Sequence, residues 1–244
     1  MNTMRTARLA GALYLAMMPF AFFTLFVRME KMPGASAAET AANILAAPGL
    51  FGAAIVTWLT SQVISIFLVV QLYKLLKPVN STQALFMLAL AFIGVPITCA
   101  NETHQFAVLM LLQNPVLSVD PDHQLAQMML QFALHDRGLA VAHIFWGLWL
   151  LPLGWLVFRS GFLPRWLGVL LLIAGAGYLV DFFTSTLFPF AAVTVTTFTF
   201  VGELLLPLWL LIKGVSEMGS GPISWQKGSD LPAIIRLNSS GRKV

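Results

Sequence analysis

The segment "GLWLLPLGWLVFRSGFLPRWLGVLLLIAGAGYLVDFF", residues 147–183, contains two long apolar runs separated by a short connection. The first run continues an apolar stretch that begins near residue 138, so both runs reach the ~20 residues that an α-helix needs to cross the hydrocarbon core of a bilayer. The connection contains Arg159, Gly161, Pro164 and Arg165, and glycine and proline are typical of tight turns. The segment therefore predicts two transmembrane helices joined by a tight turn.

The composition extends this interpretation to the whole chain. Apolar residues make up 58% of the 244 residues, charged residues make up 10%, and the mean hydropathy is +0.83. In a soluble domain about one quarter of the residues are charged. The single cysteine, Cys99, excludes an intramolecular disulfide bond. The composition therefore predicts a multi-pass membrane protein whose surroundings are the lipid bilayer.

Apolar segments of transmembrane length recur along the chain. They predict an all-α fold, a bundle of six transmembrane helices that forms one domain over residues 1–215. The segments are approximately 9–27, 50–73, 84–112, 138–158, 164–187 and 190–212. Residues 216–244 are rich in glycine, serine and basic side chains, which predicts a flexible basic cytoplasmic tail.

The basic residues follow this topology. When alternate connections are assigned to opposite sides of the membrane, only Arg28, Lys31 and Arg137 of the 14 basic residues fall on one side. The positive-inside rule then places both termini in the cytoplasm of a cell-membrane protein. The net charge of +4 is thereby explained by topology, and no nucleic-acid partner is predicted.

The connections on the outer side contain two helix-start signals. Ser36 and Glu39 have the spacing of a capping box. Asp120 precedes Pro121, a residue favoured at the first position of a helix. We expect short amphipathic helices in these outer loops, lying along the membrane interface or over the mouth of the bundle.

Polar residues interrupt the third apolar segment. Glu102 should face the bundle interior, because an ionisable side chain within a span is costly when it faces lipid. His104 lies two residues later, about 200° around the helix axis, and therefore faces elsewhere. The residues at spacings of three and four that share the face of Glu102 are Gly94, Thr98, Asn101 and Gln105.

Three other segments each contribute an ionisable residue at a similar depth. These residues are His143, Asp181 and Glu203. Together with Glu102 they predict an outward-facing polar cavity in the outer half of the bundle. The candidate cavity or binding residues are Asn101, Glu102, Gln105, His143, Asp181 and Glu203.

Three interpretations of these ionisable residues at a common depth remain open. The first is a cavity that binds or moves a small molecule, a lipid, an ion or a proton. The second is a membrane-embedded metal-dependent hydrolase, with His143, Glu102, Asp181 and Glu203 as the available metal ligands. The third is a structural or regulatory protein whose buried polar groups only hold helices together. No cofactor is predicted outside the second interpretation, and the absence of the common catalytic motifs weighs against an enzyme.

Four blocks of the sequence also carry a resemblance. They are "RLAGALYL" at 8–15, "LYKLLKPVN" at 72–80, the 147–183 segment quoted above and "GELLLPLWLLIKG" at 202–214. The chain resembles a family of prokaryotic six-helix integral membrane proteins known as domain of unknown function 4386. The resemblance implies the fold and topology, and it places Asp181 and Glu203 on polar positions of the family pattern. The family has no established activity to transfer.

Overall fold

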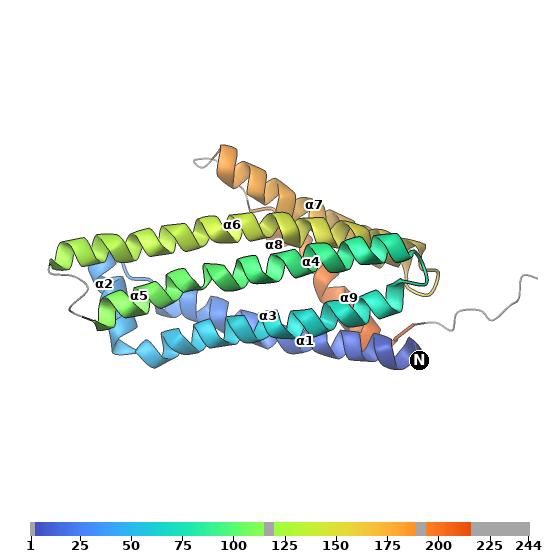
Figure 1. The fold of residues 1–244 in the computed structure, drawn as a ribbon, viewed down its shortest axis with the longest axis horizontal. Helices are drawn as coiled ribbons and strands as arrows, with labels where there is room; N and C mark the ends of the chain where they lie inside the picture. Colours follow the sequence, from blue (N-terminus) through green and yellow to red (C-terminus); the bar gives the residue numbers. More distant parts are fainter. Residues whose placement is uncertain (1–2, 115–119, 189–193, 216–244) are drawn as a thin grey trace, which may run out of the picture.

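The computed structural model describes residues 3–114, 120–188 and 194–215, and every regular element within them is a helix (Figure 1). The predicted all-α fold is confirmed for these residues. The elements are α1 (Thr3–Phe26), the π-helix η1 (Val27–Lys31), α2 (Ala37–Ala46), α3 (Pro48–Leu76), α4 (Ser81–Asn101), α5 (Thr103–Gln113), α6 (Pro121–Arg159), α7 (Arg165–Leu187), α8 (Thr196–Thr199) and α9 (Val201–Ile212).

Long apolar helices dominate the fold. Within the described residues, 5 helical segments are long and apolar enough to cross a membrane. Large apolar side chains cover their outer faces; Phe67 and Phe86, for example, are 58% and 56% exposed. Extensive exposed apolar surface of this kind marks a membrane-contacting surface. The chain is therefore a multi-pass membrane protein. The 5 segments are Thr3–Lys31, Pro48–Leu76, Ser81–Gln113, Pro121–Arg159 and Arg165–Leu187.

The described part of the sixth apolar segment forms two short helices. Helices α8 and α9 together cover Thr196–Ile212, and they are separated at Phe200. Residues 189–193, which overlap the start of the predicted span, lie outside the described part of the chain. A sixth helix of full transmembrane length is therefore not confirmed.

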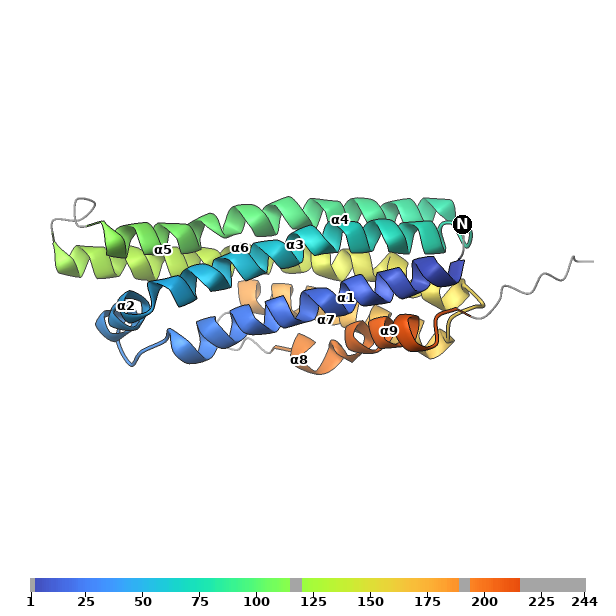
Figure 2. The same cartoon turned by 90° about the horizontal axis from the view of Figure 1, so that it is seen from below.

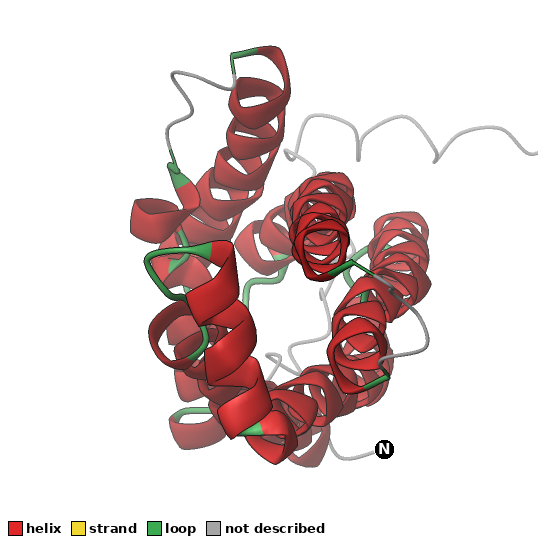
Figure 3. Cartoon of the chain, turned by 90° about the vertical axis from the view of Figure 1, so that its left-hand side faces the viewer, coloured by secondary structure: helices red, strands yellow, loops and turns green. Residues whose placement is uncertain are grey.

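The long helices are arranged around a common axis, and α7 diverges from the others towards its C-terminal end (Figures 1 and 3). The N-terminus, the α3–α4 and α6–α7 connections and the end of α9 lie at one end of the bundle (Figures 1 and 2). Helix α2, the end of α5 and the start of α6 lie at the other end. Successive connections therefore lie at opposite ends of the bundle, as the predicted topology requires. The cytoplasmic orientation stays a prediction, and the predicted tail, 216–244, lies outside the described residues.

Glycines bring α6 and α7 into close contact. An added Cβ at Gly147 would lie 2.7 Å from the carbonyl oxygen of Gly175, and one at Gly154 would lie 2.8 Å from that of Gly168. Neither pair of backbones could approach so closely with larger side chains. The turn between the two helices contains Gly161 at φ 72°, a conformation that favours glycine. The predicted helical hairpin is thereby confirmed.

The two predicted outer-loop helices have different outcomes. Helix α2 forms as expected, since Ser36 Oγ accepts a hydrogen bond from Glu39 N at 3.2 Å and Glu39 Oε2 accepts one from Ala35 N at 2.7 Å. Asp120 also caps a helix, because its Oδ1 accepts from Asp122 N at 3.1 Å. That helix is the 39-residue α6. The prediction of a separate loop helix before the fourth span is wrong, because no residue there ends the helix.

A polar layer separates two apolar cores. One core includes Leu72, Met87 and Leu153, and the other includes Phe51 and Met128. In α3, α4–α5 and α6, buried polar residues lie in sequence between the two cores. Because these helices run along one axis, these residues form one layer across the bundle. They are Ser61, Gln62, Thr98, Asn101, Glu102, Gln105 and His135.

Candidate binding site

Glu102 forms a buried ion pair in the polar layer. Its Oε2 lies 2.5 Å from Arg28 Nη2 and its Oε1 lies 3.2 Å from Arg28 Nη1, so the guanidinium binds the carboxylate with two parallel bonds. His135 Nε2 lies 3.2 Å from the same Oε1. Glu102 is 0% exposed. We call Arg28, Glu102 and His135 the Arg28 cluster; its acid is fully compensated by a neighbouring base.

Local backbone irregularities place the members of this cluster. Arg28 lies in η1, the single wide turn that follows α1, and Glu102 occupies the interruption between α4 and α5. Asn101 Nδ2 donates to the carbonyl oxygen of His135 at 2.9 Å, which ties α4 to α6. Gly138 leaves room for this bond, because an added Cβ there would lie 1.8 Å from Asn101 Oδ1. The cluster therefore joins α1, α4 and α6.

An outer cavity of about 530 Å³ adjoins the Arg28 cluster. Its walls include Arg28, Gln105, His135 and Trp58. Gln105 is 2% exposed and its Oε1 has no hydrogen-bond partner. The guanidinium carbon of Arg28 lies 6.0 Å from the centre of the Trp58 ring, which is within the range of a cation–π contact.

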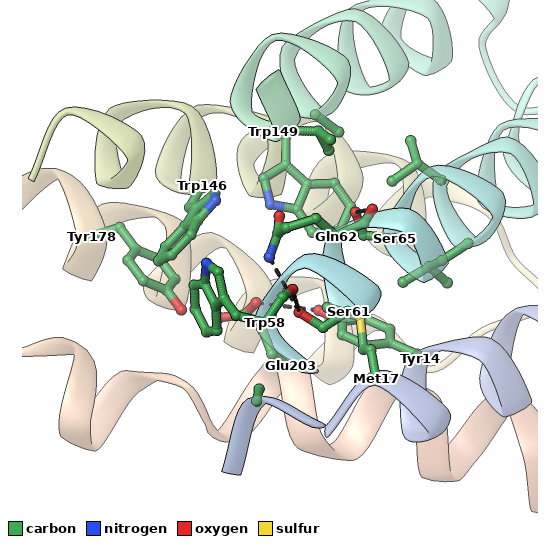
Figure 4. A pocket seen from close by; sticks show the side chains of 15 residues that line it. Tyr14, Met17, Trp58, Ser61, Gln62, Ser65, Trp146, Trp149, Tyr178 and Glu203 are labelled. Carbon is green, nitrogen blue, oxygen red and sulfur yellow. Dashed lines mark hydrogen bonds between the residues drawn. The ribbon is translucent and has the colours of Figure 1, made fainter. Parts of the chain in front are cut away.

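A central cavity of about 170 Å³ (Figure 4) shares Trp58 with the cavity beside the Arg28 cluster. Five of the 15 residues that line it are aromatic, and Glu203 is the acidic residue among them. Tyr14 Oη donates to Glu203 Oε2 at 3.2 Å. Figure 4 shows the carboxylate between Tyr14 and Tyr178. The other oxygen, Oε1, is buried and has no hydrogen-bond partner within the described part of the chain. The aromatic residues of the wall are Tyr14, Trp58, Trp146, Trp149 and Tyr178.

The remaining polar wall of the central cavity comes from α3. The Ser61 hydroxyl donates to the carbonyl oxygen of Trp58 at 2.7 Å, and the Ser65 hydroxyl donates to that of Gln62 at 2.6 Å. Gln62 Nε2 donates to Ser61 Oγ at 3.3 Å. The hydrogens of these hydroxyls are therefore used within the helix.

A second, lateral cavity of about 530 Å³ continues from the central one. It extends between α1, α6 and the α8–α9 segment, past Phe22 and Phe200. Phe22 is 59% exposed and Phe200 is 40% exposed. Glu203 thus belongs to the walls of both cavities. The residues common to the two walls are Tyr14, Ala21, Trp58, Trp146, Tyr178 and Glu203.

His143 and Asp181 have different environments. The His143 ring packs between Trp146 and Tyr178, with ring centres 5.3 and 5.4 Å away. Asp181 accepts hydrogen bonds from Val195 N at 2.6 Å, from Thr196 N at 3.0 Å and from the Thr196 hydroxyl. The Asp181 carboxylate therefore fixes the start of α8 against α7.

The structure divides the predicted site residues among separate environments. The inward face of the third span is confirmed, because Asn101, Glu102 and Gln105 are all buried. His104 faces a neighbouring helix as predicted, with Nδ1 2.8 Å from Gln131 Oε1. The four ionisable residues do not surround one cavity. Glu102 belongs to the Arg28 cluster, His143 and Asp181 share a wall of another cavity, and Glu203 with His143 lines the lateral one.

The sequence-based prediction missed Arg28, His135 and Tyr14. A signal was available for His135, since it follows Met128 and Phe132 at helical spacing and so continues their packing face. For Arg28 and Tyr14 the sequence offers no comparable signal.

The described residues contain no group of three or more histidine, cysteine, aspartate or glutamate side chains placed to hold a metal ion. His143 and the three acidic residues that the hydrolase interpretation requires are distributed over the environments above. That interpretation therefore has no supporting geometry in the described part of the chain.

Comparison with known proteins identifies the family of the chain. A family model described as "Domain of unknown function (DUF4386)" matches residues 9–214. The chain belongs to the DUF4386 family. It is 30% identical over 164 residues to an uncharacterized protein of Archaeoglobus fulgidus, an alignment that covers 66% of this chain and 84% of that protein. No solved structure matches. The DUF4386 match includes both the Arg28 cluster and the central cavity, and the resemblance inferred from the sequence is confirmed.

Proposed function

We propose that this DUF4386 protein binds a small molecule or ion in the central cavity and exchanges it through the lateral cavity. One observation carries the proposal: a glutamate within the apolar part of the bundle lines the cavity without an ion-pair partner among the described residues, and its buried Oε1 has no hydrogen-bond partner there. An ionised group at the centre of a membrane costs roughly 3 kcal/mol or more. Residues retained at that cost within spans are typical of ligand and ion pathways.

The environment of Glu203 supports a ligand more than a structural role. Within the described residues no lysine, arginine or histidine forms an ion pair with Glu203, whereas Glu102 is paired with Arg28. A group that only joins helices would be expected to have its hydrogen-bonding capacity filled. Both carboxylate oxygens of Glu102 have partners in the Arg28 cluster, although Arg28 Nε is buried without one, whereas Glu203 Oε1 has no partner among the described residues. Glu102 therefore fits the structural interpretation better than Glu203 does.

Access to the cavity from water provides a direct test. In a Cys99→Ser background, Ser61→Cys places a thiol in the wall of the central cavity, and the purified protein is reconstituted in lipid vesicles. The thiol is then labelled with methyl methanethiosulfonate, a small neutral reagent that reacts with the thiolate. We expect labelling within the bundle, because a water-filled cavity allows the thiol to ionise.

The matched control is Val63→Cys, two residues away on α3, where the side chain is 52% exposed on the outer, apolar surface. A thiol facing lipid ionises poorly, so Ser61→Cys should react at least about tenfold faster than Val63→Cys. Equal and slow rates at the two positions would contradict an accessible binding cavity.

A further inference from the structure

We infer that the ligand of the central cavity is a small organic cation, an amine or quaternary ammonium group held by Glu203 and the surrounding aromatic rings. The inference rests on the proposed function and names the ligand class. It follows from the charge, the aromatic walls, the supply of oxygen atoms and the size of the cavity.

The charge of the wall favours a cation. Among the residues that the structure describes, Glu203 is the acidic residue that lines the central cavity, and the wall contains no lysine, arginine or histidine. Two basic side chains lie near this wall without forming an ion pair with Glu203. Arg28, which contacts Trp58, binds Glu102 through both of its terminal nitrogens. His143, which lines the lateral cavity with Glu203, packs its ring against Trp146 and Tyr178. A cationic ligand would supply the charge that the described residues do not.

The aromatic residues favour an organic cation. The ring centres of Trp58 and Trp146 are 6.2 Å apart, and those of Trp146 and Tyr178 are 6.0 Å apart at 80°. Rings arranged at steep angles around a space can direct more than one π-face or edge at a single group. Aromatic walls with a nearby carboxylate are a recurring way to recognise amines and quaternary ammonium ions.

The wall of the central cavity offers little polar surface for an inorganic cation. Sodium-sized and larger metal ions are bound by several oxygen ligands at once, typically six or so for a hard cation. Most of the wall surface is apolar, and the wall residues with side-chain oxygens are Tyr14, Ser61, Gln62, Ser65, Tyr178 and Glu203. A methylated ammonium group can contact an apolar, aromatic surface without several oxygen ligands.

The volume limits the ligand to a few heavy atoms. At about 170 Å³ the central cavity is smaller than the roughly 300–1,000 Å³ of pockets for drug-sized molecules. Tetramethylammonium and choline are suitable probes of this size class. The neutral molecule 3,3-dimethyl-1-butanol has the shape of choline with carbon in place of the charged nitrogen, so it isolates the effect of charge.

The test measures protection of Ser61→Cys from methyl methanethiosulfonate. We expect choline and tetramethylammonium to slow labelling about tenfold at concentrations where 3,3-dimethyl-1-butanol changes the rate less than about twofold. Glu203→Gln should abolish protection by the cations. The exposed Glu39→Gln serves as the matched control and should preserve it.

The outcomes separate this inference from the proposed function. Equal protection by choline and its neutral analogue would overturn the cation class while leaving a binding cavity. Rapid labelling of Ser61→Cys without protection by either cation would also overturn the cation class and leave an accessible cavity. Failure of Ser61→Cys to react faster than Val63→Cys would overturn both. Cation protection that survives Glu203→Gln would overturn the assigned role of the carboxylate.

Discussion

Glu102 and Glu203 are both acidic residues inside the bundle, yet the protein treats them in opposite ways. The Glu102 carboxylate binds the Arg28 guanidinium and the His135 imidazole, and Asn101 fixes the adjacent helix junction by its bond to the His135 carbonyl. The Glu203 carboxylate accepts from Tyr14 and lies in a wall that contains phenol and indole rings, and one of its oxygens has no partner among the described residues. The comparison indicates that position within a membrane span does not define the role of an acid. Its neighbours do: a compensated acid holds helices together, and an uncompensated one is available to a ligand.

The largest effect should come from removing the base that compensates Glu102. Arg28→Met leaves a buried carboxylate without its counter-ion, and breaking one partner of a buried pair costs about 3–5 kcal/mol. We expect a matching loss in the free energy of unfolding, measured by denaturant titration in detergent micelles. The double variant Arg28→Met with Glu102→Leu should recover most of that loss, because it removes both charges. A double variant as unstable as the single one would contradict the ion-pair explanation.

The geometry of the Arg28 cluster can be disturbed without changing a charge. Gly138→Ala adds a Cβ that would lie 1.8 Å from Asn101 Oδ1, so the bond from Asn101 to the carbonyl of His135 must break or shift. Such overpacking typically costs about 1–3 kcal/mol. The control is Gly52→Ala in α3, where no atom lies within 4 Å of the new Cβ. It should be neutral or stabilising by up to about 1 kcal/mol, the difference in helix propensity.

The different environments of Glu102 and Glu203 could be predicted only in part from the sequence. The period of three and four in the third span correctly places Glu102 inward, and the glycine and proline that follow Arg159 correctly indicate the turn between α6 and α7. These features depend on one helix or on one adjacent pair. The alternation of the apolar segments places Arg28 in a connection on the side opposite the termini. Its inward position depends on the π-turn η1, for which the sequence provides no marker.

The predicted common cavity illustrates the same limit. Depth along a span can be estimated from the sequence, because each helical residue advances the chain by a fixed rise. The sequence does not show which neighbouring helix a side chain faces, because that depends on how the helices pack. Four ionisable residues at a similar depth therefore suggested one site, while the packing of α8 against α7 turns Asp181 towards the backbone of Val195 and Thr196.

Asp181 is intermediate between Glu102 and Glu203, because its carboxylate accepts hydrogen bonds from backbone N–H groups and is not paired with a base. Asp181→Ala removes the acceptor for Val195 N and Thr196 N. Loss of such a capping acceptor costs about 1 kcal/mol. We expect that decrease in stability, together with faster hydrogen exchange confined to the amides of α8. Faster exchange throughout α6 as well would indicate a wider structural role than the capping contact.

The smallest effect on stability should come from Glu203→Gln, although the residue is the centre of the proposed site. The substitution keeps the size of the side chain and an oxygen that accepts from Tyr14, and it removes a charge that no described base compensates. We expect a change within about 0.5 kcal/mol, or a small gain in stability. The equivalent substitution Glu102→Gln weakens the partner of Arg28 and should cost about 2–3 kcal/mol. Measured side by side under identical denaturant conditions, the two variants test the comparison directly. A large loss for Glu203→Gln would mean that Glu203 is a structural residue like Glu102, and the functional distinction between the two acids would no longer hold.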